Sequence, residues 1–245
     1  MMRLFEREAA GIYRLRVPFE NLTTSVFLLV TPEGPVLYDC ATTSEDVERV
    51  ILPALAERRI APQDLRAVVL SHAHADHNGG LAALREHTPD VPVITAHTAA
   101  EAEVLFGCLQ ALHLPGHTAD CLGVYDLRTG TLLTADALQL MGVARFGCSL
   151  AAPEDYVQTI EKIRRLAPDR ILPAHAYVPY GDRAEGTAEI TRYLDGCLDV
   201  LAEIKAFVAE HQHWAAEEIT DAFRAQHPHW PQLPKSTVKS MQKDK

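Results

Sequence analysis

The sequence is poor in the features that mark several large protein classes. Its five cysteines are odd in number, scattered and without a C-x-x-C pair, so neither a disulfide framework nor a thiolate zinc site is expected. Internal repeats, low-complexity linkers and uncharged runs of membrane-spanning length are absent from it. Lys and Arg (23) are outnumbered by Asp and Glu (33), and the formal net charge is −10. This balance disfavours nucleic-acid binding, which usually needs a basic surface.

The length of 245 residues allows one large α/β domain with a small appendage and a substantial core. Residues 1–8 do not contain the apolar segment of a secretory signal, and the unpaired cysteines fit reduced thiols. We therefore expect a soluble, cytoplasmic protein that does not bind a membrane.

The densest group of metal-binding side chains is the stretch S-H-A-H-A-D-H-N-G-G at residues 71–80. It follows the apolar run 67–70, which predicts a buried strand that delivers the stretch to a loop. Imidazole and carboxylate groups suit zinc and neighbouring divalent ions. His72 and His74 are two positions apart, so on extended backbone they point to the same side. Together with Asp76 and His77 they predict a metal site.

Four further polar residues come directly after predicted strands: Asp39, His117, Asp136 and His175. In α/β proteins the loops at one end of the sheets build the site, so we expect these residues to converge on the histidine loop. Asp39 has a structural alternative, since an acidic residue at a strand end often only caps a helix or a loop.

Apolar periodicity predicts the other elements. Short apolar runs indicate a β-meander over residues 11–39. Helices are predicted in six segments: 43–59, a short one through 81–84, 98–106, 153–166, 187–210 and 217–225. Thr42 and Glu45 fit a capping box for the first of them.

We expect residues 187–245 to form a helical extension that packs on the main domain, residues 1–186. A homodimer interface is the alternative for the apolar stripe of the helix at 187–210. The histidines of the extension lie among Trp and Pro without a carboxylate pattern, so a packed appendage is predicted there rather than a second metal site. They are His211, His213, His227 and His229.

Together these motifs resemble the metallo-β-lactamase superfamily over residues 11–175. The resemblance implies a four-layer αββα sandwich, here a catalytic domain over residues 1–186, with two metal ions at one edge. It implies that His72, His74 and His117 hold one ion. It also implies that Asp76, His77 and His175 hold the other, that Asp136 bridges both, and that Asp39 supports the ligand loop without binding metal.

This ligand set suits catalysis, because three ligands per ion and one shared carboxylate leave positions for a hydroxide and a substrate oxygen. Asp76 can orient the nucleophile and assist proton transfer to the leaving group, so it is the expected catalytic residue and no protein nucleophile is needed. Zinc is the expected metal, with iron or manganese as alternatives for the same nitrogen and oxygen donors.

Residues 136–146 resemble the corresponding segment of glyoxalase II thioesterases and persulfide dioxygenases, although Val143 and Ala144 replace a Cys-Gly pair. Lactone-cleaving members carry a tyrosine where this chain has Gln139. The predicted substrate contacts are Gln139, Arg145, Tyr177 and Tyr180. The family's P-G-H-T-x-G-S motif is also altered at residues 115–121, where Asp120 and Cys121 take the last two places. Asp120 is expected to be an ordinary loop residue.

The first hypothesis is a binuclear metallohydrolase that cleaves a carboxylic ester, lactone or thioester of a small molecule. The second is an iron-dependent persulfide dioxygenase of the same fold. The third is a non-catalytic, metal-dependent scaffold that binds a partner through its C-terminal helices. Flavin-partnered di-iron members are disfavoured because they normally have Glu at the position of His74, and the acidic charge disfavours a nuclease.

Overall fold

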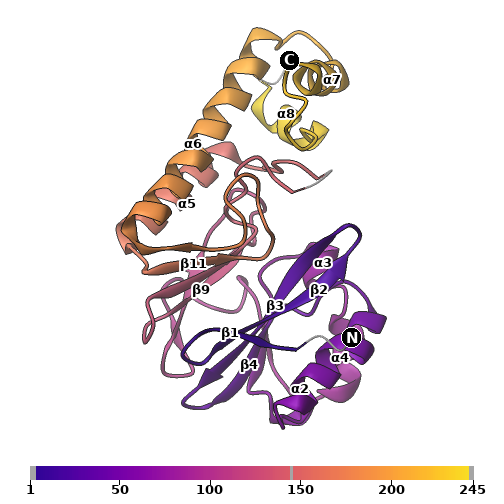
Figure 1. Ribbon diagram of the computed structural model, residues 1–245, viewed down its shortest axis with the longest axis vertical. Helices are drawn as coiled ribbons and strands as arrows, with labels where there is room; N and C mark the ends of the chain where they lie inside the picture. The colour runs from indigo at the N-terminus through magenta and orange to yellow at the C-terminus, as the bar shows by residue number, and fades with distance from the viewer. Residues whose placement is uncertain (1–3, 144–145, 243–245) are drawn as a thin grey trace. The chain divides into compact units, whose positions relative to one another are not determined.

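The computed structural model describes residues 4–143 and 146–242, which form two compact units (Figure 1). The first unit comprises Met1–His113 and Leu122–Leu133, and the second comprises Leu114–Cys121 and Thr134–Lys245. The C-terminal helices belong to the second unit, and the division into residues 1–186 and 187–245 stays a prediction.

The first unit contains a six-stranded sheet in the order β1-β2-β3-β4-β5-β6. Strands β1 to β4 pair antiparallel and β4, β5 and β6 pair parallel. Four consecutive residues at the centre of β3, from Val26 to Leu29, are fully buried, so this strand is covered on both faces. The strands are β1 (Glu6–Ala9), β2 (Ile12–Phe19), β3 (Leu22–Thr31), β4 (Gly34–Tyr38), β5 (Ala67–Val69) and β6 (Val93–Ile94).

Short helices cover one face of this sheet, where α2 and α4 lie beside it in Figure 1. Leu28 and Val68 of the sheet share a core cluster with Ile51, Leu55 and Leu84 of the helical segments. The segments are α1 (Ser44–Asp46), the π-helical η1 (Val47–Ile51), α2 (Leu52–Glu57), the 3-10 turn η2 (Pro62–Asp64), α3 (Ala75–Asn78) and α4 (Leu81–His87).

The capping box at the start of α1 is one residue later than predicted. Thr43 is the N-cap: its hydroxyl accepts from Asp46 N at 3.1 Å, and Asp46 accepts from Thr43 N at 2.9 Å. The prediction that Thr42 and Glu45 form the capping box was wrong. Asp46 takes the place of Glu45, and its carboxylate also accepts from the amide of Thr42, at 3.3 Å. The later register thus satisfies more of the free amides at the helix start.

A second six-stranded sheet has the order β12-β11-β10-β9-β8-β7. Strands β7 (Val104–Leu105), β8 (Leu109–His113) and β9 (Leu122–Asp126) belong to the first unit. Strand β10 (Thr131–Ala135) begins in the first unit and ends in the second, which holds β11 (Arg170–Pro173) and β12 (Ala184–Glu185).

The predicted helix at 98–106 is wrong. The segment instead forms turns and strand β7, because its backbone bonds to β8: Ala102 N donates to Ala111 O at 2.9 Å, and Ala111 N donates to Glu103 O at 2.8 Å. Tertiary pairing has overridden the local helical pattern.

The second unit holds four helices among its described residues: α5 (Pro153–Leu166), α6 (Gly186–Glu210), α7 (Ala216–Gln226) and α8 (Lys235–Met241). Helix α5 packs along α6, and α7 and α8 gather near the C-terminal end of α6 (Figure 1). The apolar stripe predicted on α6 is buried, including Leu194, Leu201 and Ile204. Within the described part of the chain, no helix combines the length and apolar character needed to cross a membrane.

Candidate metal centre

In the first unit, strand β5 leads into the histidine loop, and Asp39 lies at the end of the neighbouring strand β4. The Asp39 carboxylate is fully buried and accepts three hydrogen bonds, from Ser71 N (2.7 Å), Ser71 Oγ (2.9 Å) and His77 Nδ1 (2.8 Å). Asp39 thus ties the start of the loop to its end.

These bonds fix the proton positions of two imidazoles. His77 Nδ1 must donate, because the Asp39 carboxylate only accepts. Ser71 Oγ already donates to Asp39, so it accepts from His72 Nδ1, at 2.9 Å. In both rings the lone pair is therefore on Nε2, which is the state a metal ligand requires.

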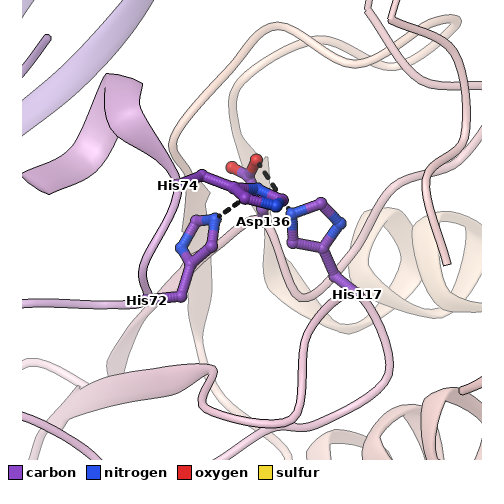
Figure 2. A group of neighbouring side chains, drawn as sticks. All are labelled: His72, His74, His117 and Asp136. Carbon is purple, nitrogen blue, oxygen red and sulfur yellow. Dashed lines mark hydrogen bonds and ion pairs between the residues drawn. The ribbon is translucent and has the colours of Figure 1, made fainter. Parts of the chain in front are cut away.

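Neighbouring donor atoms in the loop have the spacing of ligands that share an ion. His72 Nε2 lies 3.1 Å from His74 Nδ1 (Figure 2), and His77 Nε2 lies 3.4 Å from Asp76 Oδ2. Tetrahedral ligands at about 2.1 Å from zinc are separated by about 3.4 Å.

In the second unit, His117 is in a Pro-Gly turn after β8. Gly116 permits this turn, since its φ is +138° and a Cβ there would come within 2.6 Å of the backbone of Tyr156. His117 Nδ1 donates to the carbonyl of Ser149 at 2.7 Å, which again places the lone pair on Nε2.

The two carboxylate oxygens of Asp136 face different histidines. Oδ2 lies 3.7 Å from His117 Nε2, and Oδ1 lies 3.5 Å from His175 Nε2. All three side chains are buried. One imidazole therefore lies opposite each oxygen of the Asp136 carboxylate.

Among the described residues, two groups of donor atoms each lie within 4.8 Å of one another. They are His72, His74, His117 and Asp136, drawn in Figure 2, and Asp76, His77 and His175. The donors are imidazoles and carboxylates, which bind divalent metal ions. Thiolates do not contribute, and burial raises the pKa of the Cys121 thiol to about 12 and that of Cys197 to about 11.

The predicted substrate contacts have different surroundings. Gln139 and Tyr177 are 2% and 1% exposed, and Gln139 Nε2 donates to Tyr177 Oη at 3.1 Å. Tyr180 is 36% exposed and its ring lies 5.1 Å from the guanidinium of Arg192. Arg145 lies outside the described residues.

Three supporting residues were not predicted from the sequence. Ser71 orients His72, Ser149 orients His117, and the Thr24 hydroxyl of strand β3 donates to Asp76 Oδ2 at 3.3 Å. Ser71 had a local signal, because it directly precedes the first histidine. Thr24 and Ser149 had none, since each lies far along the chain from the residue it contacts.

Replacing Ser71 with alanine is expected to weaken metal binding by about 10- to 100-fold, because His72 loses the acceptor that sets its tautomer. Competition with a metal chelator measures the change. Thr88→Val is a matched control, since Thr88 is a buried residue of the same unit. Among the described residues its hydroxyl bonds only to the carbonyl of Leu84 in the adjoining helix. Equal metal affinity in Ser71→Ala and wild type would show that Ser71 does not set the tautomer.

Comparison with known sequences identifies the family. The sequence model of the metallo-β-lactamase superfamily matches residues 20–107 and 89–175. The chain belongs to the metallo-β-lactamase superfamily.

Its curated relatives within this superfamily include the hydroxyacylglutathione hydrolase of Idiomarina loihiensis. The two are 28% identical over 159 residues, which cover 57% of this chain and 61% of that protein. The hydroxyacylglutathione hydrolase of Yersinia enterocolitica is also 28% identical, over 56% of this chain and 57% of its own length. The chain thus spans about three-fifths of the curated relatives it matches.

A solved metallo-β-lactamase family protein from Thermus thermophilus superposes with a TM-score of 0.64 at 18% identity, over 96% of this chain and 92% of that one. The expected fold class is confirmed: two sheets flanked by helices form the metallo-β-lactamase type of α/β sandwich, and a helical C-terminal segment follows.

Proposed function

We propose that this metallo-β-lactamase superfamily member is a hydrolase that uses two divalent metal ions to cleave a carboxylic ester, lactone or thioester. The observation that carries the proposal is the Asp136 carboxylate, which presents one oxygen toward His117 and the other toward His175. Seven side chains of the two donor groups would then hold two ions, with Asp136 shared between them.

The residues fit such a pair of ions. In His72, His77 and His117, Nδ1 donates a hydrogen bond to an oxygen of the protein, so the lone pair on Nε2 is free to bind a metal. Five imidazoles and two carboxylates favour zinc, and iron or manganese are alternatives for the same donors. When bound, two such ions lower the pKa of a water molecule and polarise a substrate carbonyl.

Asp76 is the proposed proton carrier. Its Oδ2 receives the Thr24 hydroxyl bond at 3.3 Å and faces His77 Nε2 at 3.4 Å, so the orientation of the carboxylate is fixed. A carboxylate held in this way can accept the proton of the attacking water and pass it to the leaving group. The chain therefore needs no nucleophile of its own.

The curated relatives support acyl hydrolysis, since they are named hydroxyacylglutathione hydrolases. The persulfide dioxygenase and scaffold hypotheses stay predictions, as does the homodimer. A two-ion hydrolase is favoured over a single-iron oxygenase because His77 and His175 supply ligands for a second ion. Asp136 also presents one oxygen to each of two histidines. We also propose a cytoplasmic location, which the five buried, free cysteines support.

Elemental analysis combined with a substrate panel tests the proposal. The panel is an acyl lactone, a glutathione thioester, a β-lactam, a phosphodiester and a persulfide. We expect about two metal equivalents per chain and turnover of the lactone or the thioester. A metal-replete protein that is inert toward every acyl compound, or that holds one iron and oxidises the persulfide, would refute it.

A further inference from the structure

The segment 148–150 connects a proposed metal ligand to the C-terminal extension. Its central residue, Ser149, supplies the carbonyl that accepts the hydrogen bond of His117 Nδ1, at 2.7 Å. The direction in which His117 presents Nε2 therefore depends on where this carbonyl is held. Residues of two other segments of the second unit hold it.

Helix α8 holds the residues on both sides of Ser149. The Thr237 hydroxyl accepts from Leu150 N at 2.9 Å and donates to Cys148 O at 2.9 Å. Ser240 Oγ, one turn later, lies within hydrogen-bond distance of both Leu150 O (2.9 Å) and Thr237 O (2.8 Å), which share its one proton. Thr237 is fully buried, so water does not compete for these bonds.

Gln139 holds Ser149 from the Asp136 side. Its Oε1 accepts from Ser149 N at 3.0 Å, and its Nε2 donates to Asp136 O at 2.9 Å and to Tyr177 Oη at 3.1 Å. The amide orientation is unambiguous, because a backbone N–H must donate and a carbonyl must accept. Both amide protons are thus committed within the protein, which suits a positioning role rather than a substrate contact.

We infer that Thr237 and Gln139 are positioning residues of the metal centre, and that helix α8 takes part in holding His117 through Ser149. The inference rests on the proposed function in that it takes His117 to be a metal ligand. The C-terminal extension then contributes to metal affinity as well as to packing. Loss of a partner behind a ligating histidine typically costs 10- to 100-fold in metal affinity or activity.

Thr237→Val tests the inference, because it keeps the shape of the side chain and removes both hydrogen bonds. Thr220→Val is the matched control. Thr220 is 2% exposed in α7, and within the described part of the chain its hydroxyl bonds only to Ala216 O of the same helix, at 2.9 Å. Thr237→Ser keeps the hydroxyl and should restore the wild-type values. The measurements are the zinc dissociation constant by chelator competition, kcat and KM on the substrate found active, and the thermal midpoint.

For Thr237→Val we expect zinc binding about tenfold weaker and a lower kcat with little change in KM. Thr220→Val is expected to keep the wild-type zinc affinity, kcat and KM. A lower thermal midpoint in Thr237→Val with unchanged zinc affinity and kcat would overturn the inference and leave the proposed function intact. Wild-type protein that binds no divalent metal would overturn both. If Thr237→Val does not fold, Gln139→Met must show the same loss of zinc affinity, and wild-type affinity in that variant overturns the inference.

Discussion

Asp136→Asn is expected to release about one of two bound metal ions and to reduce hydrolysis on the order of 1,000-fold. An asparagine side chain has one carbonyl oxygen to offer a metal, whereas each oxygen of Asp136 faces a different histidine, at 3.7 and 3.5 Å. The substitution preserves the shape of the side chain, so the fold should persist. Metal content per chain and kcat/KM measure the result.

Asp120→Asn is the matched control for this variant, because it makes the same change of charge three residues after His117 at a residue outside both donor groups. It should retain wild-type metal content and turnover. Two ions and full activity in Asp136→Asn would show that the carboxylate is not shared, and the two-ion mechanism would be wrong.

Asp76→Asn is expected to lower kcat by about 100- to 10,000-fold, the usual contribution of a positioned proton carrier. An amide cannot take the proton of the attacking water, although it can still accept the Thr24 hydroxyl bond that holds Asp76 in place. Steady-state kinetics over a range of pH measure the effect.

Metal content must be measured on the same Asp76→Asn preparation, since Asp76 is also a proposed ligand. Reduced kcat at full metal loading supports proton transfer, and restoration of activity by excess metal would assign Asp76 to metal binding alone. Full turnover without added metal would contradict both roles.

The candidate metal site could be proposed from the sequence because its signal is local. His72, His74, Asp76 and His77 lie within one short stretch after an apolar run, and the later candidate ligands each follow a strand. Periodicity likewise predicted the bounds of α5 correctly and those of α6 to within one residue. Patterns of this kind are set by neighbours in the chain, which the sequence displays directly.

The supporting contacts could not be predicted because they join distant residues. Thr24 contacts Asp76 from 52 positions away, Ser149 contacts His117 from 32, and Thr237 contacts Leu150 from 87. Serine and threonine are common, and their spacing carries no ligand pattern. The predicted helix at 98–106 failed for a related reason, since pairing with β8 decides its conformation.

Anomalous diffraction from crystals of the metal-loaded protein tests the central claim most directly. The account predicts two metal peaks, one within bonding distance of each carboxylate oxygen of Asp136. The other protein ligands of one ion are histidine nitrogens, and those of the second ion are histidine nitrogens and Asp76. A single peak, or peaks bound by residues other than these, would contradict it.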